Sequence, residues 1–148
     1  MLAKSLVIFI SVGVLAGFSF GFYLLDMKNT NQLVYVDGSS LSIVTEKSDF
    51  KRGEEIKITI INSGTNPLTF PDTSYGLKIS GLFGIVKYSP SSSQIVSTLN
   101  PREEIVFVWN QMKNDSLPVI EGLYKISADG IDSMGNKVEK SITVNIWK

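Results

Sequence analysis

One stretch near the N-terminus constrains this chain more than any other feature of its sequence. Between Lys4 and Asp26, the residues from Ser5 to Leu25 read SLVIFISVGVLAGFSFGFYLL, and none of them is charged. A helix of about 20 apolar residues is long enough to cross the roughly 30 Å hydrocarbon core of a bilayer. Such a helix also satisfies its own backbone hydrogen bonds, as lipid requires. The stretch therefore predicts one transmembrane α-helix over residues 5–25.

A cleaved secretory signal peptide is the alternative interpretation of this stretch. Leu6–Leu15 would form its apolar region, and Ala16 and Gly17 would be the small residues at the cleavage site. Apolar residues continue through Leu25, however, so the mature protein would begin with an exposed apolar tail, which a soluble domain tolerates poorly. A lipoprotein would need Cys where Phe18 stands. We therefore favour an uncleaved signal anchor.

The charges that flank the predicted helix indicate its orientation. Lys4 and the amino terminus lie on one side, whereas Lys28 on the other side is offset by Asp26. Because positive charge favours the cytoplasmic side of a membrane, residues 1–4 are predicted to be cytoplasmic. The chain is then a single-pass protein of the cytoplasmic membrane, and its C-terminal domain is extracytoplasmic.

Glycine recurs every four residues in the predicted helix, at Gly13, Gly17 and Gly21. This spacing places the three glycines on one face, where small residues allow two membrane helices to approach closely. The stripe predicts a helix-packing face that would associate with another transmembrane helix. The alternative explanation is that glycine is simply frequent in membrane helices.

The period of the sequence changes after the predicted helix. Residues 26–40 are mostly polar and typical of a linker, with Leu33–Val36 as a candidate first edge strand. Apolar and polar residues then alternate in Leu41–Thr45 and Ile56–Ile60. This alternation directs one face of each segment to a core and the other to water. Asp49–Gly53 is predicted to be the turn between these two strands.

Short apolar runs separated by turn residues continue to the C-terminus. None of them has a helical period, and β-branched and aromatic residues dominate them. Residues 41–148 are therefore predicted to form one all-β domain, an immunoglobulin-like antiparallel β-sandwich of about seven to nine strands. The remaining predicted strands are Leu68–Phe70, Tyr75–Ile79, Ile85–Tyr88, Ile95–Leu99, Glu104–Asn110, Leu123–Ala128 and Lys137–Trp147.

The chain contains no Cys and no His. Disulfides, thiol catalysis, cysteine zinc sites and imidazole chemistry are thereby excluded. Small secreted eukaryotic domains rely on disulfides, so their absence indicates a prokaryotic source. The 14 basic and 14 acidic residues are scattered along the chain, whereas nucleic-acid binding needs concentrated basic charge. We therefore expect no nucleic-acid partner.

Several motifs lie between Ile56 and Tyr124. A predicted strand ends in Asn62, the pair Thr69-Phe70 follows, and Tyr75 precedes an alternating strand. Later come Leu99-Asn-Pro101-Arg-Glu103, Trp109 and Glu121-Gly122-Leu-Tyr124. These motifs resemble the BsuPI family of intracellular proteinase inhibitors, which has a strand ending in Asn, a Thr-Phe pair, a Tyr before an alternating strand, and then Leu-x-Pro-Gly-Glu, Trp and Pro-Gly-x-Tyr.

Two residues depart from the family's pattern. Arg102 stands in place of a Gly, and Glu121 stands in place of a Pro. The matching residues are mostly those that form turns and cores. The resemblance implies an immunoglobulin-like sandwich and, as an activity, the inhibition of a proteinase.

Two polar loops contain candidate modification or metal sites. Asn114-Asp-Ser116 is an acceptor sequence for N-glycosylation, which would modify Asn114 if the host glycosylates its surface. Asp129, Asp132 and Asn136 carry oxygen ligands that suit calcium, although their spacing is not that of an EF-hand. We favour a hairpin connection there, in which Asp, Gly and Asn supply turn conformations.

No group of residues in the sequence predicts catalysis, and no cofactor or metal site is expected. The adjacent carboxylates Glu54-Glu55 and Glu103-Glu104 point to opposite faces of a strand, so neither pair converges on a substrate. Ser and Lys are frequent, but no Ser-x-x-Lys motif opens a helix. We therefore predict that the protein is not an enzyme.

The loop Gly81–Gly84 carries two large apolar residues, Leu82 and Phe83, between glycines. We expect both side chains to fold back into the core. If they are exposed instead, they form an apolar interaction loop for a partner pocket or a membrane surface.

Trp109 is expected to lie in the core, because alternation places it on the same strand face as Ile105 and Phe107. An anchored sandwich without catalytic residues recognises other molecules through its loops or sheet edges. We therefore predict a membrane-anchored domain that binds a protein partner or serves as a scaffold. The alternatives are a BsuPI-type proteinase inhibitor and an accessory subunit of a larger envelope or membrane complex.

Overall fold

The computed structural model describes residues 10–19 and 33–148. The chain divides into two compact units, residues 1–32 and residues 33–148. In the first unit, residues 10–19 are α-helical and exposed. Among the described residues, no helix has the length and hydropathy needed to cross a bilayer. The ends of the transmembrane helix predicted over residues 5–25, with Gly21 and residues 26–32 of the linker, lie outside the described residues.

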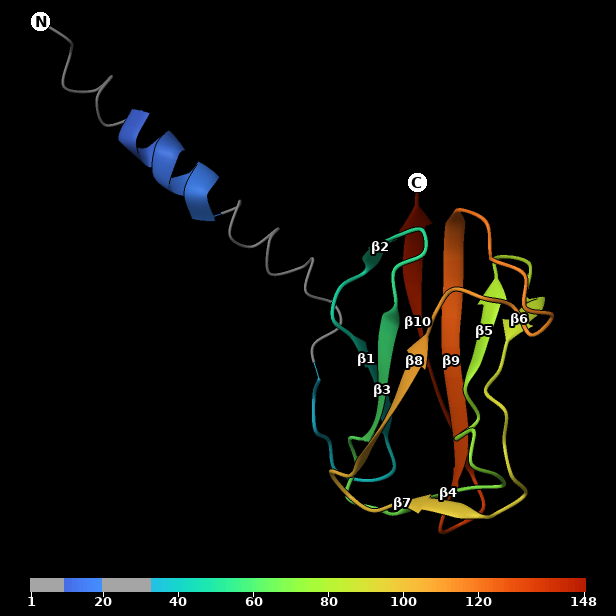
Figure 1. The fold of residues 1–148 in the computed structure, drawn as a ribbon. Coiled ribbons are helices and arrows are strands. Elements are labelled where there is room, and N and C mark those ends of the chain that lie inside the picture. The colour runs from blue at the N-terminus through green and yellow to red at the C-terminus, as the bar shows by residue number, and fades with distance from the viewer. Residues whose placement is uncertain (1–9, 20–32) are drawn as a thin grey trace, which may run out of the picture. The chain divides into compact units, whose positions relative to one another are not determined.

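Residues 33–148 form a sandwich of two β-sheets (Figure 1). The smaller sheet contains β1 (Leu41–Thr45), β3 (Ile56–Asn62) and β8 (Glu104–Trp109), all antiparallel, with β3 in the centre. The larger sheet has seven strands, arranged around β9 (Gly122–Asp132) and β10 (Lys137–Trp147). Its other members are β2 (Asp49–Lys51), β4 (Leu68–Phe70), β5 (Lys78–Gly81), β6 (Val86–Tyr88) and β7 (Ser97–Leu99).

The chain crosses between the sheets directly after β1. β1 pairs antiparallel with β3, but β2 pairs parallel with β10, so that Phe50 lies beside Ile146. The prediction that Asp49–Gly53 is only a turn was wrong, because Asp49–Lys51 is a strand. Phe50 is 1 % exposed, and the burial of this ring holds the short strand on the larger sheet. Residues 33–148 thus contain ten strands and one parallel pair, where about seven to nine antiparallel strands were expected.

The core lies between the two sheets. Trp109 is fully buried, as predicted, and Ile105 and Phe107 pack against the core from the same face of β8. Val106 and Val108 point outward and are 40 % and 55 % exposed. The other largest buried side chains are Phe50, Phe70, Ile56, Ile58, Ile60, Leu68, Leu77, Ile79, Ile126 and Ile146.

The strand directions define two ends of the sandwich, visible in Figure 1. At the entry end, residues 33–40 join the sandwich where β3 ends, and the Val36 N–H donates to the Ser63 carbonyl at 2.9 Å. Residues 33–36 have no strand conformation, so the predicted edge strand Leu33–Val36 was wrong. The opposite end is called the tip end. It contains the β5–β6 turn, the segment 110–121 and the C-terminus.

Asn62 explains one of the motifs shared with the resembled family. Its side chain is fully buried and joins three segments. Its Nδ2 donates to the carbonyls of Asn66 and Leu99, both at 2.8 Å, and its Oδ1 accepts from the Gly64 N–H at 3.0 Å. A buried amide is stable only when it is hydrogen-bonded in this way. Asn62 is therefore a structural residue of the entry end.

Several strands differ in their bounds from the predicted ones, and two of these differences have local backbone reasons. Tyr75 and Gly76 have φ values of 53° and 66°, which a strand does not allow. β5 therefore begins at Lys78 and not at Tyr75. β9 continues past Ala128 to Asp132, because Gly130 leaves space for the Phe70 ring that lies against its Cα.

Candidate functional site

In each predicted carboxylate pair one member holds a turn, namely Glu54 and Glu103, while Glu104 is the first residue of β8. Lys47 Nζ and the Lys51 N–H donate to the Glu54 carboxylate, and the Asn100 N–H donates to Glu103 at 2.8 Å. These hydrogen bonds lower the pKa of Glu54, with the Lys47 bond as the largest cause, and the Asn100 bond lowers the pKa of Glu103. Both groups therefore stay ionised, and their oxygens hold turns closed.

The loop with calcium-type ligands is a hairpin connection, as favoured from the sequence. Asp132 Oδ1 accepts from the N–H groups of Met134 and Asn136, both at 2.9 Å. Asp132 Oδ2 accepts from Ser39 Oγ at 3.1 Å and Asn136 Nδ2 at 3.3 Å. The hydrogen bonds to Asn136 are the largest cause that lowers the pKa of Asp132. Both carboxylate oxygens are thus engaged by donors of the protein.

Asn114 lies exposed in the segment 110–121. Its N–H donates to the Lys87 carbonyl at 3.0 Å, and its Oδ1 accepts from the Ser89 N–H at 3.1 Å. These bonds fasten the segment to β6. Glycosylation of Asn114 stays a prediction, on a residue that the fold holds at the surface.

The two described glycines of the predicted helix-packing face, Gly13 and Gly17, are exposed within the helical residues 10–19. A side chain at either position would meet no atom within 4 Å. The packing face stays a prediction, and its third residue, Gly21, lies outside the described residues.

The apolar loop between β5 and β6 is exposed, which corrects the expectation that its side chains return to the core. The Gly84 N–H donates to the Gly81 carbonyl at 3.0 Å and closes a tight turn, in which Gly84 has a φ of 76°. Leu82 is 71 % and Phe83 is 95 % exposed. The turn follows the pair of Gly81 with Tyr124 and lies beside the start of β9, where neither side chain is buried. We call Leu82 and Phe83 the tip.

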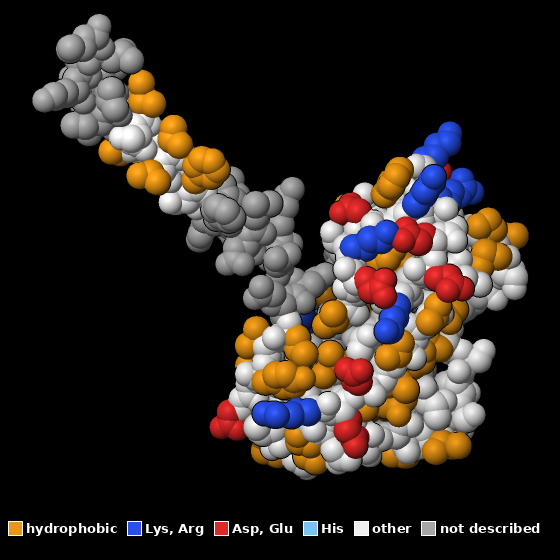
Figure 2. Space-filling model, turned by 60° about the vertical axis from the view of Figure 1, so that its left-hand side comes forward, with side chains coloured by type: hydrophobic (Ala, Val, Ile, Leu, Met, Phe, Trp, Pro, Cys, Tyr) orange, Lys and Arg blue, Asp and Glu red, His pale blue; other side chains and the backbone are white. Residues whose placement is uncertain are grey.

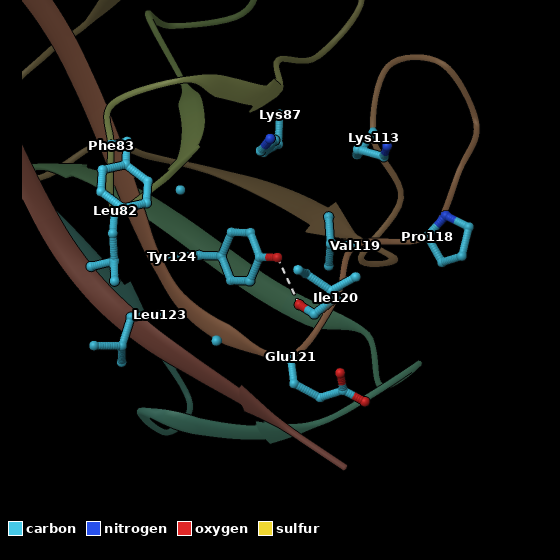
Figure 3. A pocket seen from close by; sticks show the side chains of 12 residues that line it. Leu82, Phe83, Lys87, Lys113, Pro118, Val119, Ile120, Glu121, Leu123 and Tyr124 are labelled. Atoms are coloured by element: carbon cyan, nitrogen blue, oxygen red, sulfur yellow. Dashed lines mark hydrogen bonds between the residues drawn. The ribbon is translucent and has the colours of Figure 1, made fainter.

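A groove of about 340 Å³ lies beside the tip (Figure 3). Apolar side chains of the tip, of Ile120 and of Leu123 line it, and the Tyr124 ring lies between them. Tyr124 Oη donates to the Ile120 carbonyl at 2.6 Å, and burial raises the pKa of this phenol. This hydrogen bond connects the start of β9 to the preceding segment. It thereby holds the Tyr124 ring in place at the floor of the groove.

Charged side chains border the groove on opposite sides (Figure 3). Glu121 forms an ion pair with Arg52 at 3.1 Å, and Lys113 pairs with Asp115 at 3.5 Å. Lys87 has no ion pair within the part of the chain that the structure describes. The border of the groove thus offers one unpaired ammonium group beside apolar walls.

Sequence reasoning found the tip but missed Ile120 and Leu123. Both are large and exposed, at 70 % and 43 %. Leu123 was assigned to a strand, and an exposed side chain on a strand's outer face carries no sequence signal of its own. The sequence offered one indication of this apolar surface, namely a large apolar residue, Ile120, within a loop segment.

On the face shown in Figure 2, Lys and Arg side chains are interspersed with Asp and Glu. This distribution agrees with the scattered charges of the sequence.

Comparison with known proteins identifies no family. No family model matches the chain, and no curated protein matches it. The crystal structure of Spo0M, a sporulation control protein from Bacillus subtilis, is similar at a TM-score of 0.44 and 12 % sequence identity. The match covers 76 % of this chain and 51 % of Spo0M, so the chain spans about half the length of that structure. The resemblance to BsuPI-type inhibitors stays a prediction after these comparisons.

Proposed function

We propose that this protein is a membrane-anchored, extracytoplasmic immunoglobulin-like domain that binds another protein through its tip end and carries out no catalysis. The observation that carries the proposal is the exposed pair Leu82 and Phe83 beside the groove at Tyr124. Large apolar side chains that gather at one surface site are typical of recognition surfaces.

The proposed anchor is the uncharged stretch Ser5–Leu25. Its support is the length and hydropathy of the stretch, together with the helical conformation of residues 10–19. An N-terminus inside the cytoplasm follows from Lys4 and the positive-inside rule.

The proposed immunoglobulin-like class is supported by strand pairing and by Tyr124. One sheet joins β1, β3 and β8, and the other joins β2, β10, β9 and β5 in that neighbour order. Near the start of β9, Tyr124 Oη donates to a carbonyl four residues upstream. This arrangement is similar to the tyrosine corner that recurs in immunoglobulin-like sandwiches, and it supports the proposed class.

A protein partner is favoured over a membrane surface by the groove of about 340 Å³ beside the tip. Protein interfaces seat single anchoring side chains in such pockets, whereas a lipid surface offers none.

The proposal is tested by capture of partners from membranes in mild detergent, with crosslinking mass spectrometry of the full chain. The double variant Leu82→Ser, Phe83→Ser is expected to lose the crosslinked partner. Met134→Ser is the matched control, because Met134 is 76 % exposed in the β9–β10 turn at the entry end. Retention of the partner by the tip variant, or recovery of the native chain only as a free monomer, contradicts the proposal.

Proteinase inhibition is a second candidate, supported by the BsuPI resemblance and by an exposed loop that a proteinase cleft can receive. The full chain in detergent is mixed with a panel of serine proteinases. Slow cleavage within Gly81–Gly84 together with reduced enzyme activity supports inhibition, whereas rapid proteolysis without any reduction excludes it.

Membership of a larger membrane complex is a third candidate and depends on the glycine stripe. Gly17→Leu is expected to reduce association with another helix, since a bulky side chain holds the two backbones apart. If partners co-purify unchanged, the sandwich is the contact surface.

A further inference from the structure

The smaller sheet has an open edge at β8. Asn62 of β3 donates its N–H to the Glu103 carbonyl at 3.0 Å, on the β8 side. In an antiparallel strand, alternate residues direct their backbone N–H and C=O groups toward the same neighbouring strand. The backbone groups of Ile56, Ile58 and Ile60 therefore also point toward β8. Their register partners are Trp109, Phe107 and Ile105. The residues between them, Glu104, Val106 and Val108, therefore direct their N–H and C=O groups away from β3.

These outward groups have no hydrogen-bond partner within residues 10–19 and 33–148. Native sheets protect their edges with Lys, Pro, bulges or covering loops. The open side of β8 instead carries two exposed valines, with one charge, Glu104, at its start. The opposite edge of this sheet differs, because Leu41, Ile43 and Thr45, whose backbone groups point away from β3, are buried residues.

The unpaired N–H and C=O groups along β8 can be satisfied by an extended backbone that lies beside it. Only another strand places donors and acceptors at the spacing that alternating N–H and C=O groups require. We propose that this strand is β8 of a second copy of the chain, paired antiparallel about a two-fold axis. The two smaller sheets then form one continuous six-stranded sheet.

The sequence of β8 is complementary to itself in one register. With Val106 opposite Val108 of the second copy, the outer face carries two valine pairs, and Glu104 lies opposite Asn110. On the inner face, Phe107 lies opposite its own equivalent. Cross-strand apolar pairs stabilise a ladder, whereas like charges placed opposite destabilise it. This register has no such pair of charges.

The proposed pairing buries a small area and fixes how the two copies are arranged. One added strand buries less than the about 1,200 Å² of a standard stable interface, so the dimer dissociates on dilution. The two entry ends lie at opposite ends of the joined sheet. The tip takes no part in the pairing, and the inference therefore stands independently of the proposed function.

Amide hydrogen exchange measured by NMR on the full chain in detergent micelles tests the pairing residue by residue. The Ile105 and Phe107 amides bond to β3 and are expected to be protected at every concentration. The Val106 and Val108 amides are expected to gain at least about tenfold protection between about 10 μM and 1 mM protein. Val106 and Val108 amides that exchange rapidly throughout, or are already protected at the lowest concentration, overturn the proposal.

Variants supply a second measurement. Val106→Lys is expected to shift analytical ultracentrifugation toward the monomer, since two added charges would lie within the ladder. Thr143→Lys adds the same charge on the exposed face of β10 and is expected to leave the dimer unchanged. Because the chain has no Cys, the double variant Val106→Cys, Val108→Cys should form a disulfide-linked dimer. Dimers that persist in Val106→Lys, or an unlinked double variant, contradict this register.

Discussion

Trp109 lies at the centre of the aromatic contacts in the core. Its ring is 6.1 Å from the Tyr88 ring and 5.8 Å from the Tyr124 ring, and its Nε1 donates to the Met112 carbonyl at 2.8 Å. Trp109→Ala removes these contacts and leaves a large cavity. The expected loss is about 3–5 kcal/mol in the free energy of unfolding, enough to unfold many domains of this size.

Chemical denaturation measures this loss, and Trp147→Ala is its control. Trp147 is 50 % exposed, so its truncation is expected to cost far less than that of Trp109. Equal losses for the two variants would show that Trp109 is not the core residue described here.

Arg102 occupies a backbone conformation that suits glycine. Its φ is 69°, and the resembled family has Gly at this position. The guanidinium lies 5.4 Å from the centre of the Tyr35 ring, so any truncation also removes this contact. Arg102→Gly is therefore compared with Arg102→Ala, which loses the same contact. The free energy of unfolding of the Gly variant is expected to exceed that of the Ala variant by about 1 kcal/mol, because only Ala keeps the backbone strain. Chemical denaturation measures the difference.

At the scale of elements, the approach of the β4–β5 loop to β9 depends on Gly76. Its φ is 66°, and a Cβ there would run into the backbone oxygen of Asp129. Gly53 has a φ of 83° but faces open space. Gly53→Ala is expected to cost about 1 kcal/mol from strain alone. Gly76→Ala should cost clearly more, because the loop must also move off β9, and equal costs would contradict that close approach.

The β9–β10 hairpin should lose stability in acid. The pKa of Asp132 is lowered in the fold by hydrogen bonds from Asn136, while that of an unfolded Asp is about 3.9. A group with a lowered pKa stabilises the fold above its unfolded pKa, and the effect disappears as the pH falls through the folded pKa. Melting temperatures between about pH 6 and pH 2 should therefore fall less steeply in Asp132→Asn than in the native chain.

The sequence predicted the bounds of three strands correctly, and β1 among them has the regular alternation of a half-buried strand. The bounds of Leu41–Thr45, Leu68–Phe70 and Lys137–Trp147 agree with β1, β4 and β10. Short strands such as β2 depend on which sheet they join, and alternation over three residues does not specify that. The same limit applies to the site, since sequence located the tip but not the side chains of other elements that line the groove.

At the scale of the whole molecule, the two proposed contact surfaces are separate. The tip and the groove lie at one end of the sandwich, whereas Val106 and Val108 lie along the edge of the smaller sheet. A chain paired through β8 can therefore still present its tip. Partner capture by the Val106→Lys variant is accordingly expected to equal that of the native chain, and a loss of capture would show that the two surfaces depend on each other.

The parallel pairing of β2 with β10 has a mechanical consequence. Once β1 has separated from β3, tension applied between residue 33 and the C-terminus pulls the start of β2 and the end of β10 in opposite directions. In parallel strands such a pull is carried by all of the joining hydrogen bonds at once, as in a shear joint, whereas a hairpin opens one bond at a time. A domain held at its N-terminal side and pulled from its far end would therefore resist extension until this short joint failed as a whole.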